Sequence, residues 1–401
     1  MKYLIAFDKF KGALSAAEAG RIAASEIADL DPSGTILQAP LTDGGEGFAT
    51  ILAGALDGRL LKVEVAGPRF KPAKGRITLV EASHIPPAAM ERLQLPPAAA
   101  TGTIAFVEMA SASGYEQLAD GERDPWKTTT LGTGQLMKAA VEAGAGAIVL
   151  GIGGSATNDC GAGALEALGV VYYDRDLQPV KDITPAEFKR VTSAGSMSHL
   201  LDSFPPVRIA CDVSNPLLGE NGATRVYGPQ KGLKEEDFER LERNVRKMAT
   251  RLLGLFGRDI GEWDKLMEEP GSGAAGGIGF ALRHALPDSR FVEGFPLVAE
   301  LLDLEVKAGQ ADLILTGEGR IDESSLHGKG PVALVRRARP DQSLVLLAGS
   351  VQESTAAKLR SSHSRLRVQA ISDPSWPLEK ALAETQNSLR RALRKILSGA
   401  E

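Results

Sequence analysis

The stretch Gly151–Asp159 reads Gly-Ile-Gly-Gly-Ser-Ala-Thr-Asn-Asp, and it organises the interpretation of the whole chain. The apolar run 147–150 before it predicts a buried strand, and 161–168 after it predicts a short helix that Gly169 ends. A strand, a glycine turn and a helix start aim backbone N–H groups and a positive dipole end at an anion. Because the turn holds more polar residues than one helix end needs as caps, we expect it to bind a ligand. The expected contacts to substrate or phosphate are Gly153, Gly154, Ser155, Thr157 and Asn158.

Two other phosphate-binding turns can be compared with this stretch. A P-loop has a lysine after its glycines, and this turn has none, so that class is excluded. The dinucleotide pattern G-x-G-x-x-A is met by Gly151, Gly153 and Ala156, with a second strand at 170–173 and Asp174 as the ribose ligand. Against it, the polar Thr-Asn-Asp cluster stands where that fold packs an uninterrupted helix. An NAD-dependent dehydrogenase of a small hydroxy acid is therefore kept as the alternative enzyme.

Composition narrows the class of protein. The chain has 401 residues, enough for two domains, and 43% of them are hydrophobic. A net charge of −5 and an aromatic content of 5% argue against a nucleic-acid or membrane surface. Cys160 and Cys211 are its two cysteines, too few for a disulfide framework. With no apolar run long enough for a signal peptide or a membrane span, we expect a cytoplasmic protein.

The two ends of the chain share one pattern that the middle lacks. Strands and helices alternate in both end regions, and Ser15 with Glu18 forms a capping box for the first helix. The expected strands are 3–7, 35–39, 60–65, 311–315, 343–347 and 366–370 at the ends, and 77–81, 103–109, 147–150 and 208–211 in the middle. This predicts an α/β fold: a parallel-sheet, Rossmann- or flavodoxin-like domain from residues 1–66 and 290–401, with a second α/β domain, 67–289, inserted.

Charged residues follow the first two strands, at the sheet edge where α/β proteins bind ligands. Asp8, Lys9 and Lys11 follow the first strand, and Asp43 and Glu46 follow the second. Asp43 ends a strand and precedes two glycines, which would let a substrate approach it without a steric clash. Asp43 is therefore the strongest candidate among the loop carboxylates.

Six motifs, taken together and in this order, resemble the bacterial type I glycerate kinases. They are 8–12 (Asp-Lys-Phe-Lys-Gly), 42–47 (Thr-Asp-Gly-Gly-Glu-Gly), 151–159, 211–212 (Cys-Asp), 228–232 (Gly-Pro-Gln-Lys-Gly) and 316–322 (Thr-Gly-Glu-Gly-Arg-Ile-Asp). The resemblance spans nearly the whole chain. It implies ATP-dependent, Mg²⁺-assisted phosphorylation of D-glycerate and a two-domain α/β fold with an inserted domain.

Phosphoryl transfer needs oxygen ligands for Mg²⁺, cations on the phosphates and a carboxylate near the attacking hydroxyl. The residues expected to be catalytic are Asp43, Lys11 and Arg320, and Arg320 also offers a fork that matches a carboxylate. Besides the glycine turn, the expected substrate or phosphate contacts are Asp8, Lys231, Glu318 and His327. The expected metal ligands are Asp159, Asp212 and Asp322.

Three further expectations concern the product, the assembly and a thiol. The favoured product is 2-phosphoglycerate, although 3-phosphoglycerate is also possible by this interpretation, and the protein is expected to be a monomer or a homodimer.

A non-enzymatic sensor of small acids is the remaining alternative function. Such a sensor would have no use for so many loop carboxylates and lysines. Cys160 is expected at a helix N-terminus, where the dipole would lower the pKa of the thiol and make it sensitive to peroxide.

Overall fold

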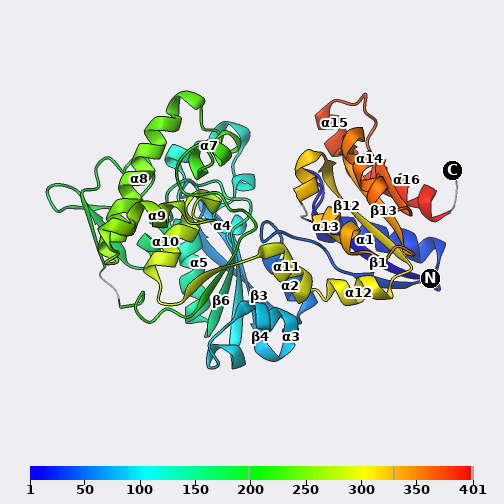
Figure 1. The fold of residues 1–401 in the computed structure, drawn as a ribbon, viewed down its shortest axis with the longest axis horizontal. Coiled ribbons are helices and arrows are strands. Elements are labelled where there is room, and N and C mark those ends of the chain that lie inside the picture. Colours follow the sequence, from blue (N-terminus) through cyan, green and yellow to red (C-terminus); the bar gives the residue numbers. More distant parts are fainter. Residues whose placement is uncertain (197–198, 328–329, 399–401) are drawn as a thin grey trace. The chain divides into compact units, whose positions relative to one another are not determined.

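The computed structural model describes residues 1–196, 199–327 and 330–398. It divides into two compact units: unit 1 consists of Met1–Asp43 with Val298–Glu401, and unit 2 consists of Gly44–Leu297. Both ends of the chain belong to unit 1, which in Figure 1 is dark blue in its first segment and yellow to red in its second. Unit 2 is thus inserted in the sequence of unit 1. The divisions fall after residues 43 and 297, whereas the sequence pattern placed them after 66 and 289.

Unit 1 contains a five-stranded sheet in which every neighbouring pair is parallel. Its spatial order is β14-β13-β12-β1-β2, so the strands taken in chain order are arranged 2-1-3-4-5, the flavodoxin-like order. The expected parallel-sheet fold is confirmed. Its strands are β1 (Lys2–Phe7), β2 (Thr35–Gln38), β12 (Leu313–Ile321), β13 (Ser343–Val351) and β14 (Leu366–Ala370). Its helices are α1 (Ala16–Leu30), α12 (Leu304–Gln310), α13 (Gly330–Arg337), α14 (Glu353–Ser362), α15 (Leu378–Ala383) and α16 (Thr385–Leu397).

Helix α1 begins as its sequence predicts and is fixed to the end of the chain by a buried carboxylate. The Ser15 hydroxyl accepts from the backbone N–H of Glu18, and the Glu18 carboxylate accepts from the backbone N–H of Ser15. Further along α1, the fully buried Glu26 accepts from Arg390 (2.7 Å) and Arg394 (2.5 Å) of α16. Burial raises the pKa of Glu26, but the two arginines outweigh it and bring the pKa below its usual value.

Unit 2 contains a six-stranded mixed sheet in the order β11-β10-β6-β5-β4-β3. The neighbours from β5 to β11 are parallel, and the pairs β3–β4 and β4–β5 are antiparallel. The strands are β3 (Arg59–Ala66), β4 (Pro72–Glu81), β5 (Thr103–Glu108), β6 (Ala147–Gly151), β10 (Val207–Ala210) and β11 (Ser289–Val292). Its helices are α2 (Phe48–Ala55), α3 (Pro87–Leu93), α4 (Ala110–Ser113), α5 (Leu131–Glu142), α6 (Ala162–Ala167), α7 (Ala223–Tyr227), α8 (Phe238–Leu255), α9 (Trp263–Glu268), α10 (Ile278–Ala285) and α11 (Gly294–Leu301), which crosses into unit 1.

Two strands do not pair as the sequence pattern suggests. The third strand, β3, was expected to join β1 and β2, but it pairs antiparallel with β4 across a short turn. Strand β7 (Val170–Tyr173) was the second strand of the dinucleotide alternative, but it pairs antiparallel with β8 (Pro179–Val180) and β9 (Ser193–Ser196) in a separate sheet. Asp174 accepts from the backbone N–H of Gln178 within the turn that leads to β8. A dinucleotide fold needs this strand parallel to β6, so the alternative fails.

No helix in the described part of the chain combines the length and the apolar character that crossing a membrane requires.

Candidate active site

Carboxylates of unit 1 gather at the carboxyl ends of neighbouring strands. Asp8 follows β1, Asp43 follows β2, and Glu318 lies in β12, which pairs with β1. The strand order reverses between β1 and β12, and open α/β sheets bind ligands at such a switch point. Asp322, just past the end of β12, is also within electrostatic range of Glu318. These four residues, Asp8, Asp43, Glu318 and Asp322, are called the acidic cluster below.

Carboxyl groups in the acidic cluster hold their protons more tightly than isolated ones do, because they are buried and their negative charges lie close together. Burial and then the charge of Asp43 raise the pKa of Asp8 to about 7, although the backbone N–H of Lys9 donates to Asp8 at 2.7 Å. Burial and then the charge of Asp8 raise the pKa of Glu318 to about 8. Carboxyl groups that titrate near neutral pH are a frequent feature of active sites.

Two of the expected cationic residues, Lys11 and Arg320, lie in unit 1, and Arg320 forms an ion pair with Asp322. Its Nε lies 3.0 Å from the carboxylate of Asp322, and 72% of its side chain is exposed. Lys11 is exposed in the loop after β1, where its backbone N approaches Gly319 of β12. The side chain of His327, and all of Lys329, lie outside the described residues.

The glycine turn of unit 2 forms as its sequence predicts, between β6 and α6. Its backbone is held by neighbouring loops: the N–H of Ala156 donates to the carbonyl of Ser113, and the carbonyl of Gly154 accepts from Tyr115. Gly151 is required by packing, because a Cβ there would lie 2.4 Å from the carbonyl oxygen of Gly44. The N–H of Gly153 donates to that same carbonyl at 3.3 Å. The residue after Asp43 is therefore seated on the glycine turn.

A buried lysine contacts the same turn. Lys231 is 5% exposed, and its Nζ donates to the carbonyl of Thr157 at 2.6 Å. Burial lowers the pKa of Lys231 to about 7, and the charge of Asp159 opposes this only in part. The lysine ends the short 3₁₀ helix Pro229–Lys231, and its ammonium lies 6.0 Å from the centre of the Tyr227 ring.

Two polar atoms of the turn are buried and lack a partner within the described chain. They are the Oγ1 of Thr157 and the Oδ1 of Asn158, and both residues are fully buried. The amide nitrogen of Asn158 donates to the Oγ1 of Thr224 at 2.9 Å, which fixes the orientation of that side chain. Buried polar atoms normally have a hydrogen-bond partner, so these two, with Lys231, favour a bound polar ligand at the turn.

The structure argues against Asp159 as a metal ligand and places Asp212 at the start of α11. Asp159 is fully buried, and it accepts from the N–H and hydroxyl of Thr130 and from the backbone N–H groups of Gly161 and Gly163. Its carboxylate therefore fixes the start of α6 instead of facing a ligand. Asp212 accepts from the backbone N–H of Phe295 through both oxygens, at 3.1 and 3.0 Å, and so caps α11.

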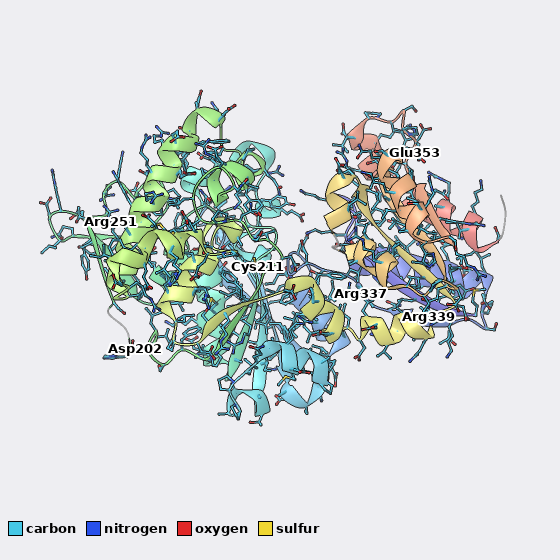
Figure 2. The ribbon with its side chains drawn as sticks, viewed as in Figure 1. Asp202, Cys211, Arg251, Arg337, Arg339 and Glu353 are labelled. Atoms are coloured by element: carbon cyan, nitrogen blue, oxygen red, sulfur yellow. The ribbon has the colours of Figure 1, made fainter. Side chains whose placement is uncertain are left out.

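The expectation of a reactive Cys160 is wrong. The thiol is fully buried, and burial, with the neighbouring charge of Asp159, raises its pKa above the usual value. The dipole of the six-residue helix α6 is outweighed by this loss of solvation. Cys211, labelled in Figure 2, is the partly exposed cysteine, and its Sγ lies 3.3 Å from the carbonyl oxygen of Val213.

The fit of Mg²⁺ can be judged from the donor set of the acidic cluster. Carboxylate oxygens are the hard ligands that Mg²⁺ prefers, and the raised pKa values of Asp8 and Glu318 mark negative charge that a cation would neutralise. No three His, Cys, Asp or Glu side chains in the described ranges lie close enough together to hold a metal ion. The chemistry fits a cation that arrives with phosphate ligands of its own.

Glu108 is a buried carboxylate of unit 2 that the sequence pattern missed. It is fully buried at the end of β5, accepts from the backbone N–H of Ala49 at 3.0 Å, and pairs with Arg76 at 2.8 Å. It therefore fixes the first turn of α2, directly after the loop that contains Asp43. A single charge at the end of an apolar strand was the available signal.

Comparison with known proteins identifies the family. The model of the glycerate kinase family matches residues 3–400. The chain belongs to the glycerate kinase family. The glycerate kinase of Bacillus subtilis (strain 168) is 34% identical, over 99% of this chain and 97% of that protein. The glycerate 2-kinase of Escherichia coli (strain K12) is 33% identical, with the same coverage of 99% and 97%.

A solved structure agrees with this membership. The crystal structure described as a glycerate kinase 2 from Salmonella typhimurium LT2 is 32% identical and superposes with a TM-score of 0.72, covering 100% of this chain and 98% of that one. Membership of the glycerate kinase family makes the chain a kinase, with ATP as a substrate, and confirms the resemblance seen in the six motifs. A non-enzymatic sensor is thereby set aside.

Proposed function

We propose that the protein transfers the γ-phosphoryl group of ATP to the 2-hydroxyl of D-glycerate, giving 2-phosphoglycerate and ADP. The match to the glycerate kinase family along almost the whole chain carries this proposal. The choice of the 2-hydroxyl is supported by the relative from E. coli, which is named a glycerate 2-kinase.

Asp43 is the base in this proposal. The attacking hydroxyl must lose a proton as its oxygen bonds to phosphorus, and a carboxylate within reach can accept that proton. Asp43 is exposed, and Gly44 and Gly45 after it carry no side chain that would obstruct a substrate. The proton passes to Asp43, the phosphoryl group passes to the substrate oxygen, and ADP leaves.

The remaining residues bind and orient charge. Lys11 and Arg320 would contact phosphate oxygens, and Mg²⁺ bound with ATP would be held by oxygens of Asp8 and Glu318 and would neutralise phosphate charge. The glycine turn, with Lys231, would bind an anionic group of a substrate. The buried position of Lys231 strengthens its attraction for an anion, because little water screens it.

The test is an ATP-coupled assay with D-glycerate and related hydroxy acids, with the position of the new phosphate read by ³¹P NMR. Turnover that needs D-glycerate and Mg²⁺ and yields 2-phosphoglycerate is expected. ATP turnover without D-glycerate would contradict the proposed substrate. A full rate in the presence of a metal chelator would contradict the need for Mg²⁺, and 3-phosphoglycerate as the product would contradict the choice of the 2-hydroxyl.

The role of Asp43 is tested by Asp43→Asn, which keeps the shape and removes the charge. We expect turnover to fall roughly a hundredfold or more, the usual scale for a general base. Added Mg²⁺ should not restore it, whereas a lost metal ligand would be partly restored. Asp57→Asn is the matched control, because Asp57 is another exposed aspartate, in the turn after α2. Near-normal turnover of Asp43→Asn would rule out the assignment.

The pH dependence of kcat/KM follows from the acidic cluster. Asp8 and Glu318, with pKa values of about 7 and about 8, carry protons in the folded protein at acidic pH and lose them as the pH rises. Because the charged forms are needed to bind Mg²⁺, kcat/KM is expected to rise across pH 6–9. The apparent values belong to the coupled group and to neither residue alone. A profile that is flat over this range would contradict the role of the cluster.

A further inference from the structure

Unit 1 contains a cavity to which no role has yet been given. Its volume is about 530 Å³, within the range of roughly 300–1,000 Å³ typical of small-molecule sites. It is bounded by the loop after β1, the ends of β13 and β14, the start of α14 and helix α15. Glu353, labelled in Figure 2, begins α14 and lies on its wall.

The cavity lies at the same sheet edge as the acidic cluster. Its wall includes Gly349–Val351 at the end of β13 and Ala370 at the end of β14, which are the carboxyl ends of parallel strands. Two other wall residues, Lys11 and Gly319, connect it with the cluster. Gly319 directly follows Glu318, and a Cβ on it would lie 3.0 Å from the backbone N of Lys11. A ligand in the cavity would therefore end beside the carboxylates.

The wall has the chemistry of a site for a flat, mostly apolar group. Phe10, Val368, Trp376 and Leu378 line it, and Leu378 is 74% exposed, so a bound ligand would cover apolar surface now in contact with water. Aromatic and aliphatic walls with a few polar groups are typical of small-molecule and cofactor sites, and aromatic side chains stack on flat rings such as a nucleotide base.

The charges on the wall argue against a site for a small acid. Arg360 pairs with Glu353 at 2.6 Å and also donates to the carbonyl of Val368. Lys11 and Asp373 add one formal charge of each sign to the wall. With its formal charges balanced, the cavity offers no excess positive charge to hold a three-carbon carboxylate, and glycerate would leave most of the volume empty.

We infer that this cavity of unit 1 binds the adenosine part of ATP. The phosphates of the bound nucleotide would extend past Lys11 and Gly319 toward the acidic cluster. The inference rests on the proposed function, since it names where the nucleotide of that reaction is held. It places the nucleotide in unit 1.

The test fills the cavity. Ala381 of α15 lines it, and Ala381→Trp would place an indole in the space of the base. We expect the Kd for ADP, measured by calorimetry without turnover, and the KM for ATP to rise at least tenfold, with the KM for D-glycerate changed less than twofold. Ala383→Trp is the matched control, because Ala383 is exposed on the same helix and does not line the cavity. Unchanged ADP binding by Ala381→Trp would overturn the inference.

A second measurement needs no bulky substitution. Trp376 lies on the wall, while Trp126 and Trp263 belong to unit 2, so ADP should change the intrinsic fluorescence of the native protein. Trp376→Phe should abolish that change; a change that persists in full would place the base elsewhere and overturn the inference.

The two proposals fail in different ways. If the native protein phosphorylates D-glycerate but Ala381→Trp binds ADP normally, only the adenosine site is wrong. If D-glycerate is not phosphorylated but ADP binding is lost in Ala381→Trp and kept in Ala383→Trp, the adenosine site stands and the proposed reaction fails.

Discussion

Replacing Lys231 by methionine is expected to make the protein more stable and less active. The ammonium of Lys231 is buried, and it donates a hydrogen bond to the carbonyl of Thr157. Methionine has a similar length and no charge, so Lys231→Met removes the cost of burying an ammonium. It also removes the cation that we propose binds an anionic substrate group at the glycine turn.

The size of the effect follows from the pKa of Lys231. A fall from 10.5 to about 7 corresponds to about 5 kcal/mol, at about 1.4 kcal/mol per pH unit. The substitution also loses the hydrogen bond to the Thr157 carbonyl, which costs about 1–2 kcal/mol. At pH 6 the variant should therefore be more stable by about 3 kcal/mol.

The sign of the effect changes with pH. The pKa of Lys231 is lowered in the folded state, so between pH 7 and 10.5 the unfolded state binds more protons and the stability of the native protein rises. Above this window the lysine is neutral in both states, and its burial costs no charge. The advantage of Lys231→Met should therefore shrink above pH 7 and reverse by about 1 kcal/mol near pH 10.5, where only the lost hydrogen bond remains.

The assay is urea unfolding at pH 6, 8 and 10, followed by tryptophan fluorescence in a Trp376→Phe background. In that background both remaining tryptophans, Trp126 and Trp263, report on unit 2. Lys234→Met is the control, because Lys234 is exposed and should change stability little at any pH. A Lys231→Met protein that is less stable than the native one at pH 6, or that keeps full activity, would refute the reasoning.

Three more predictions follow from contacts in the fold. Glu26→Ala should lower the free energy of unfolding by about 3 kcal/mol at pH 7, because it removes the buried carboxylate that accepts from two arginines; the loss should shrink as the pH falls through the lowered pKa of Glu26, and an unchanged urea midpoint would contradict it. Gly151→Ala should cost about 1–3 kcal/mol and reduce turnover, because its Cβ meets a backbone carbonyl, whereas Gly54→Ala, with open space around it, should cost nothing. A maleimide should modify Cys211 in the native protein and Cys160 only after unfolding; modification of both at equal rates would show that Cys160 is not buried.

Local sequence signals predicted individual elements well, and long-range pairing less well. The capping box of Ser15 and the strand before Gly151 form as expected, because both depend on neighbouring residues. The partner of β3 could not be foreseen, since a strand of eight residues carries no mark of whether it pairs with β1 or β4. The short turn between β3 and β4 brings these two strands together as an antiparallel pair.

The candidate site shows the same limit. The carboxylates of Asp8 and Asp43 were predicted to lie together, because parallel strands bring their carboxyl ends to one edge. Asp159 looked similar in sequence, but its carboxylate is enclosed by backbone N–H groups and Thr130. Thr130 lies 29 residues earlier in the chain, so no local pattern could distinguish this structural carboxylate from a ligand-binding one.

The insertion of unit 2 has a consequence for how the chain is made. Strand β1 pairs with β12 through Tyr3 and Leu313, so the sheet of unit 1 cannot be completed until most of the chain has left the ribosome. Unit 2 is one continuous segment, and all its strands are available once residue 297 has been synthesised. We therefore expect unit 2 to fold first during translation, while β1 waits with an open edge. A protein cut short before residue 313 would keep unit 2 and leave unit 1 without its central strand.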